Sequence, residues 1–224
     1  MPSAGPEILL EAPHIIVRLP GTHRVLSWAL VGGGLRQSSA VVWREVQSRD
    51  LGPGVCAKSL LQESLDAVGH PNAIGLLTSA PLRDYCAVQE TRDGHTAVAL
   101  ATVGLSNALA VGDPPNINPR SFGTINVLAW FSHGLSQSAT VEALSIAAEA
   151  RTTAVLEAKV QSRVSEEFAS GTGTDCIVVA SPVSPEEHSY AGKHTNAGSL
   201  LGQTCLAAVR GGISKWRTRS KSRV

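Results

Sequence analysis

Aromatic and charged side chains are scarce in this chain of 224 residues. Phe, Trp and Tyr make up 4% of the sequence and Asp, Glu, Lys and Arg 17%, whereas hydrophobic residues reach 43%. The core must therefore be built mainly from Ala, Val, Leu and Ile. The formal net charge is only +1, which argues against a surface devoted to nucleic acid.

Paired cysteines and long apolar runs are also missing. The four cysteines are widely separated and form no C-x-x-C pair, so their spacing is unlike that of a zinc knuckle or a redox motif. No uncharged apolar stretch reaches the roughly 18–20 residues that cross a membrane, and the N-terminus lacks the pattern of a secretory signal. We therefore expect a cytoplasmic protein that binds no membrane.

Motifs of several common enzyme classes are absent as well. The chain contains no GxGxxG or GxxxxGK[ST] phosphate loop, no HExxH pair and no GxSxG nucleophile elbow. Nucleotide binding, zinc hydrolysis and the α/β-hydrolase fold therefore find little support. We expect no dedicated metal site.

Short apolar or alternating runs separated by Gly and Pro predict a chain rich in β strands. Strands are expected at residues 8–10, 15–19, 25–30, 40–46, 74–78, 87–92, 97–103, 123–131 and 177–180. Helical periodicity predicts helices at residues 58–68, 138–160 and 196–209. Asp93-Gly94 is a strong hairpin signal. Because helices are few, we predict an α+β fold with a mostly antiparallel sheet, a long central helix and a C-terminal helix packed on it.

The length allows one large domain, which we place at residues 1–212. Residues 213–224 carry alternating basic side chains. Because like charges at a terminus repel one another, we expect this tail to be frayed.

A glycine-rich turn near the C-terminal end is the best candidate for a site. Gly171-Thr172-Gly173-Thr174-Asp175 precedes an apolar run, and His194 stands just before the last predicted helix. Glycine lets the backbone approach a ligand closely, and a carboxylate near a histidine can serve acid–base chemistry. The alternative for each residue alone is a Gly/Thr turn capped by Asp.

The long predicted helix carries one narrow polar stripe. Glu142, Ser145, Glu149 and Thr152 lie at helical spacing on one face. Such a stripe is usually the solvent-facing side of a helix, and the alternative is the wall of a polar cleft.

Six sequence blocks occur in an order that resembles the adenosylcobinamide amidohydrolase family. They are residues 26–34, 104–108, 123–127, 142–150, 171–175 and 192–198, within a resemblance that covers about residues 8–212. The sequence departs from the expected pattern at Trp28, where a small residue is expected, and at Ser170 and Asn196.

The resemblance implies a hydrolase that cleaves the amide between the aminopropanol arm and the corrin ring of adenosylcobinamide. The product, adenosylcobyric acid, can re-enter coenzyme B12 assembly. The partner is then a small-molecule corrinoid whose cobalt arrives with the substrate, so we expect no separate cofactor. A homo-oligomer is compatible with this interpretation.

Amide cleavage needs a nucleophile, an oxyanion donor and a proton for the departing amine. With the resemblance, Asp175 and His194 become candidates for base and acid. Thr172 and Thr174 are candidate nucleophiles, or hydrogen-bond the substrate instead. The candidate substrate-binding residues are Ser106, Asn107, Thr124, Asn126, Glu142, Glu149, Gly171, Gly173 and Thr195.

Many of these residues lie at strand ends and glycine turns, which are common positions for sites. We therefore expect seven of them to converge on one cleft: Ser106, Asn107, Asn126, Thr172, Thr174, Asp175 and His194. Two alternatives remain, a corrinoid-binding protein without catalysis and a hydrolase of the same fold that acts on another amide.

Overall fold

The computed structural model describes residues 5–115 and 123–221. The strands of the main sheet are β1 (Glu7–Glu11), β2 (His14–Ser27), β3 (Gly34–Glu45), β4 (Ile74–Thr78), β5 (Cys86–Arg92), β6 (His95–Val103), β8 (Ile125–Phe131) and β11 (Cys176–Pro182). Two small pairs are formed by β7 (Ala108–Leu109) with β10 (Gly171–Thr172) and by β9 (Gly134–Leu135) with β12 (Glu187–His188). The helices are α1 (Ala57–Ala67), α2 (Gln137–Glu157) and α3 (Asn196–Lys221), with short 3-10 turns η1 (Ser48–Leu51) and η2 (Leu82–Asp84).

The main sheet has the strand order β4-β3-β2-β11-β8-β6-β5, and β1 pairs with β2 beside β11. Among the strands that the structure describes, only the β3–β4 and β11–β8 pairs of this sheet are parallel. The predicted mostly antiparallel α+β fold is therefore confirmed. Asp93 and Gly94 both have positive φ and join β5 to β6, as the hairpin signal predicts.

The long strand β2 replaces two shorter predicted strands. Pro20 and Gly21 interrupt the apolar pattern, and the sequence therefore indicates a turn there. In the structure the chain stays extended, and the irregularity appears as a shift of register against β3 between Arg18 and His23. A β-bulge absorbs the extra residues without ending the strand.

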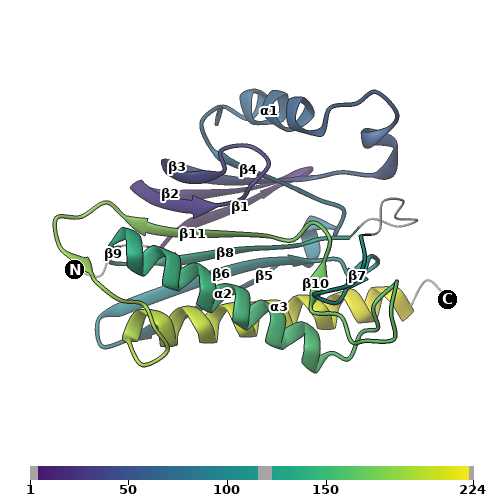
Figure 1. Cartoon of the computed structure of the whole chain (residues 1–224). Helices are drawn as coiled ribbons and strands as arrows, with labels where there is room; N and C mark the ends of the chain where they lie inside the picture. The colour runs from purple at the N-terminus through teal and green to yellow at the C-terminus, as the bar shows by residue number, and fades with distance from the viewer. Residues whose placement is uncertain (1–4, 116–122, 222–224) are drawn as a thin grey trace.

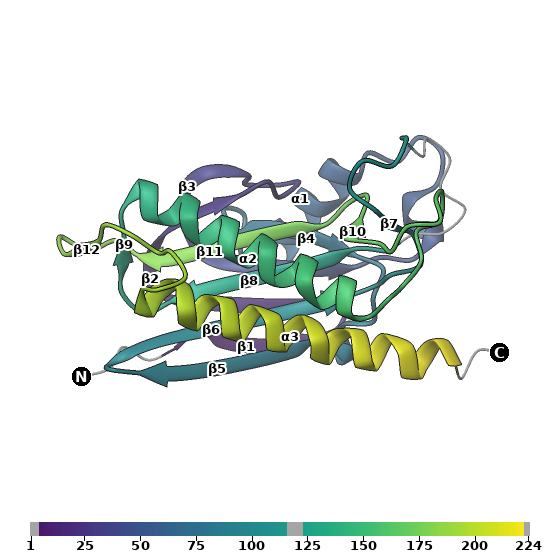
Figure 2. The same cartoon turned by 60° about the horizontal axis from the view of Figure 1, so that its bottom comes forward.

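Helices α2 and α3 lie side by side on one face of β5, β6, β8 and β11 (Figures 1 and 2). Small side chains allow this close packing: Ala97, Ala99 and Ala101 of β6 are fully buried in the same core. At Gly212 of α3, any Cβ would lie 2.5 Å from Val103 Cγ2. The prediction that the C-terminal helix packs on the sheet is confirmed.

The opposite face of the sheet curves around a second core. Trp43 of β3 and Trp130 of β8 are fully buried in it, together with Leu76 and Val178. Strands β2, β3 and β4 lie over β11 and β8, and α1 covers the outer side of β3 and β4 (Figure 1). The starts of β8 and β11 and the end of β4 lie together at one edge of this second core, where they can form a site.

The prediction for the C-terminal segment is wrong over most of its length. Helix α3 does not end near residue 209 but continues to Lys221, and Ile213 is buried against the sheet. Two of its charged side chains contact the body of the protein: Arg219 forms an ion pair with Asp84, and Lys215 Nζ donates to the Tyr85 carbonyl at 2.8 Å. Residues 116–122 and 222–224 lie outside the described residues.

In the described ranges, 5–115 and 123–221, no helix combines the length and apolar character that crossing a bilayer requires.

A buried histidine makes the second core sensitive to pH. Trp130 Nε1 donates to His23 Nε2 at 2.8 Å, so Nε2 must be unprotonated and the ring proton sits on Nδ1, which donates to the Gly21 carbonyl at 3.1 Å. Burial lowers the pKa of His23 below its usual range.

The free energy of unfolding should therefore fall as the pH is lowered from about 7 to 5. The unfolded chain takes up a proton at His23 near pH 6.5, whereas the folded chain does so only at lower pH. The slope for this one group is at most about 1.4 kcal/mol per pH unit. Urea titrations over this range check the slope, to which His14, His133 and His188 contribute in the same direction. His23→Gln should make the slope shallower, and an unchanged slope in that variant would contradict the assignment.

Candidate functional site

A cavity of about 440 Å³ lies where the first residues of β8 and β11 meet the end of β4 and η1. It is on the face of the sheet that turns away from α2 and α3, since Leu76 and Cys176 belong to the second core. One wall is apolar and includes Leu30, Val46 and Leu51. The other wall is polar: Asn107, Thr124, Asn126, Thr174 and Asp175. A mostly apolar pocket with a few polar groups on one side is typical of small-molecule sites.

Side-chain hydrogen bonds tie the strand ends of the polar wall together. Thr124 Oγ1 donates to the Thr174 carbonyl at 2.8 Å, and Thr174 Oγ1 donates to the Gly123 carbonyl at 3.2 Å. Asn126 Nδ2 donates to the Leu77 carbonyl at 2.8 Å. Their first task is thus to join β8, β11 and β4 into a rigid wall.

Asn107 differs from its neighbours because its carboxamide oxygen is buried without a hydrogen-bond partner among the described residues. Gly123 packs directly against it, and any Cβ at that position would lie 2.7 Å from Asn107 Oδ1. An unsatisfied buried acceptor costs about 1–3 kcal/mol. This oxygen has almost no exposed surface, so the N–H or O–H group of a ligand supplies the missing donor only when the carboxamide turns toward the cavity.

Asp175 is a buried anchor at the start of β11, with a side chain that is 5% exposed. Its carboxylate accepts hydrogen bonds from Ile125 N at 2.9 Å, Thr172 N at 2.9 Å and Thr172 Oγ1 at 2.6 Å. It also forms an ion pair with Arg151 of α2. Any Cβ at Gly171 would overlap both charged groups, which explains the glycine at this position of the turn.

Sequence reasoning missed Arg151. It lies four residues after Ala147 and eight after Ala143, both of which are fully buried. An arginine on the core-facing stripe of a helix requires a buried partner. That position, rather than any motif, is the signal that could have revealed it.

The predicted convergence on one cleft is wrong for His194. This side chain is exposed at the start of α3 and does not line the cavity. Thr195 lies beside it and caps the helix, since its Oγ1 accepts from Gly198 N at 3.0 Å and donates to the Gly192 carbonyl at 2.8 Å. The structure therefore does not bring the His194 imidazole into the cavity with the other candidates.

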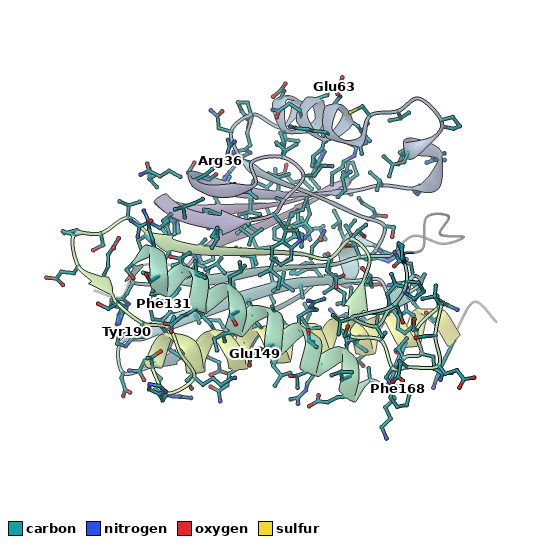
Figure 3. The ribbon with its side chains drawn as sticks, viewed as in Figure 1. Arg36, Glu63, Phe131, Glu149, Phe168 and Tyr190 are labelled. Carbon is teal, nitrogen blue, oxygen red and sulfur yellow. The ribbon has the colours of Figure 1, made fainter. Side chains whose placement is uncertain are left out.

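The two glutamates of the polar stripe hold this same loop. Glu142 Oε2 accepts from Ala191 N at 2.7 Å, and Glu149 forms an ion pair with Lys193. Glu149 lies on the side of the sheet that carries α2 and α3 (Figure 3). Both side chains are on the exposed face of α2, so the stripe does not line the cavity.

The remaining candidates lie close to the cavity but not in its lining. Thr172 and Gly171 form β10 beside Asp175, and Gly173 packs near Leu109. The Ser106 carbonyl accepts from Arg163 Nε at 3.0 Å. The structure therefore brings together Asn107, Thr124, Asn126, Thr174 and Asp175, with Thr172 attached through its hydrogen bonds to Asp175.

Comparison with known proteins supplies the family. Residues 3–221 match the model of the family described as adenosylcobinamide amidohydrolase. The chain belongs to this family. It is also 28% identical over 153 residues to the uncharacterized protein MJ1613 of Methanocaldococcus jannaschii, which covers 60% of each chain. The chain thus spans about 60% of the length of this curated relative.

Among solved structures, the PH0078 protein from Pyrococcus horikoshii is similar at 13% identity with a TM-score of 0.42. The match covers 95% of this chain and 82% of that protein. A likeness at this level adds nothing on function.

Cys176 is a potential nucleophile in the cavity wall of this amidohydrolase family member, but its environment disfavours the reactive form. Burial raises the pKa of its thiol to about 11, so the thiol stays protonated at neutral pH.

In the described part of the chain, no group of three His, Cys, Asp or Glu side chains is arranged to hold a metal ion. The expectation that the reaction needs no separate cofactor stays a prediction.

The Arg151–Asp175 pair should contribute strongly to stability. Arg151→Met leaves the buried Asp175 carboxylate without its counter-charge, and we expect a loss of about 3 kcal/mol in the free energy of unfolding. Arg210→Met is the matched control, because the Arg210–Glu157 pair is about half exposed and solvent screening should make its contribution much smaller. Urea denaturation of both variants gives the comparison, and equal losses would contradict the anchoring role of Asp175.

Proposed function

We propose that this protein hydrolyses the amide that joins the aminopropanol arm to the corrin ring of adenosylcobinamide and releases adenosylcobyric acid for coenzyme B12 salvage. Membership of the adenosylcobinamide amidohydrolase family over residues 3–221 supports the reaction class. The cavity beside the 171–175 turn is the site to which we assign the reaction.

The buried Asn107 Oδ1, to which no described residue donates a hydrogen bond, is the observation that carries the proposal. The arm of the substrate offers an amide N–H, an amide carbonyl and a hydroxyl group. Asn107 Oδ1 can accept from the N–H or O–H, and its Nδ2 can donate to the carbonyl. The apolar wall formed by Leu30, Val46 and Leu51 suits the carbon atoms of the arm.

The reaction adds water across the C–N bond, so that the carbonyl carbon becomes a carboxylic acid and the nitrogen leaves as the amine of aminopropanol. The proton on the departing nitrogen comes ultimately from the water. A donor near the carbonyl oxygen stabilises the negative charge of the tetrahedral intermediate, and we assign this role to Asn107.

The nucleophile is either a hydroxyl group of the turn or a water molecule that it holds. Thr172 Oγ1 donates to the Asp175 carboxylate at 2.6 Å, which is the arrangement in which a carboxylate can take up the hydroxyl proton. Thr174 is the alternative, because it lines the cavity directly, whereas Thr172 lies just outside the lining and reaches it through Asp175. His194 lies outside the cavity, so we no longer assign it the acid role.

A corrinoid-binding protein without catalysis is the second candidate. Two observations favour it: none of the described residues that line the cavity is a histidine, and Asp175 already accepts hydrogen bonds from three groups besides Arg151. Such a site holds its ligand but has no free base for the reaction.

Incubation with adenosylcobinamide separates the two candidates. Mass spectrometry should detect free aminopropanol and adenosylcobyric acid in equal amounts if the protein is the hydrolase. Binding of the corrinoid without either product would support the second candidate, and cleavage of other amides alone would show that the substrate is different.

Asn107→Ala should lower kcat/KM for adenosylcobinamide by about 10²-fold, the usual loss for one oxyanion donor. The matched control is Asn196→Ala, because Asn196 begins α3 away from the cavity. Both variants should unfold at temperatures close to the wild-type value. Equal kcat/KM in the two variants would remove Asn107 from the site.

Asp175→Asn should lower kcat by about 10²-fold or more, because the amide cannot take up a proton. It will also weaken the contact with Arg151, so circular dichroism must show that the variant is folded at the assay temperature. Thr172→Val and Thr174→Val identify the hydroxyl: only the nucleophile should show a comparable loss. Wild-type turnover in folded Asp175→Asn would remove the carboxylate from the chemistry and leave Thr174 as the better candidate.

A further inference from the structure

A large exposed indole stands at the mouth of the cavity. Trp28 is 48% exposed and Leu30 is 44% exposed, and both line the cavity. Trp28 follows the end of β2 directly, at the position where the sequence departs from the expected family pattern. Exposed aromatic and aliphatic groups beside a pocket mark a surface for an apolar ligand.

The indole is held in place despite its exposure. Trp28 Nε1 donates to the Asp175 carbonyl at 2.6 Å. The turn that follows is tight, since Ala29 N donates to Ser27 Oγ at 2.8 Å and any Cβ at Gly33 would lie 2.6 Å from the Ala29 carbonyl. A side chain fixed before binding loses little conformational entropy when a ligand covers it.

The size of the cavity limits what can enter. About 440 Å³ lies in the lower part of the range of about 300–1,000 Å³ that encloses drug-sized ligands. A corrin ring with its amide side chains and adenosyl ligand is much larger than such a ligand. Only one arm of the molecule can be inside, and the ring must remain at the mouth.

We infer that Trp28 is a platform on which the flat face or edge of the corrin ring rests while the aminopropanol arm enters the cavity. This inference rests on the proposed function, because it names the part of that substrate that Trp28 contacts. Aromatic stacking is worth more than the buried area alone, and the fixed indole sets the distance between the ring and Asn107. Trp28 is thus a specificity-determining residue that acts on binding and contacts no reacting atom.

Trp28→Ala and Trp28→Phe test the platform, with Phe168→Ala as a matched control. Phe168 is 47% exposed and lies on the side of the sheet that carries α2 and α3 (Figure 3). Equilibrium dialysis with adenosylcobinamide, followed by its visible absorbance, gives Kd directly. We expect Kd and KM to rise about 10-fold in Trp28→Ala, to rise less in Trp28→Phe, and to be unchanged in Phe168→Ala, with kcat similar throughout.

Binding of adenosylcobyric acid measures the contribution of the ring alone, because this compound keeps the macrocycle and lacks the aminopropanol arm. It should lose affinity in Trp28→Ala by the same factor as the substrate. A fall in melting temperature without a change in Kd would show that Trp28 has only a structural role and would overturn the inference. If the alanine variant does not fold, Trp28→Leu replaces it, and wild-type affinity in that variant overturns the inference equally.

The inference and the proposed function fail in different ways. Corrinoid binding that depends on Trp28, without cleavage, would contradict the hydrolase and keep the platform. Cleavage with the same Kd in wild type and Trp28→Ala would keep the hydrolase and contradict the platform. A wild-type protein that neither binds nor cleaves the corrinoid would contradict both.

Discussion

The buried ion pair between Arg151 and Asp175 is the contact on which the site depends. Through it the central helix α2 holds the first residue before β11, and the same carboxylate binds Thr172 of β10 and the backbone of Ile125 in β8. A buried charge pair is tolerated when most of its hydrogen bonds are made: the Asp175 carboxylate accepts from Ile125 N and from Thr172 N and Oγ1, whereas Arg151 Nε has no partner among the described residues. The polar wall of the cavity is therefore fixed from behind, through the sheet, by a helix that does not line the cavity itself.

The sheet separates two sets of polar residues that include most of the predicted site residues. Asn107, Thr124, Asn126 and Thr174 lie on the cavity side, whereas Glu142, Glu149, Lys193 and His194 lie on the side of the helices. Their functions differ accordingly. The first set surrounds a space that a ligand can fill, and the second holds the loop before α3 against α2.

Local patterns were sufficient to predict most of the fold. The Asp93-Gly94 turn, the apolar strands and the Ala-rich helix each carry a signal within a few residues, and the structure confirms them. The continuation of α3 to Lys221 could not be read in this way. In the sequence its basic residues predict a terminus extended by charge repulsion, because their partners, Asp84 and the Tyr85 carbonyl, are far away along the chain. The candidate site was predicted only in part. Glycine turns and strand ends can be recognised in the sequence, whereas the side of the sheet on which His194 lies depends on tertiary packing.

The most direct test of the account is a crystal structure of the protein with a non-hydrolysable analogue of adenosylcobinamide, in which a methylene group replaces the amide nitrogen. The account predicts the aminopropanol arm inside the cavity, its carbonyl oxygen within hydrogen-bond distance of the Asn107 side chain, and the corrin ring against Trp28. A corrinoid bound on the α2–α3 side, near His194, would contradict it.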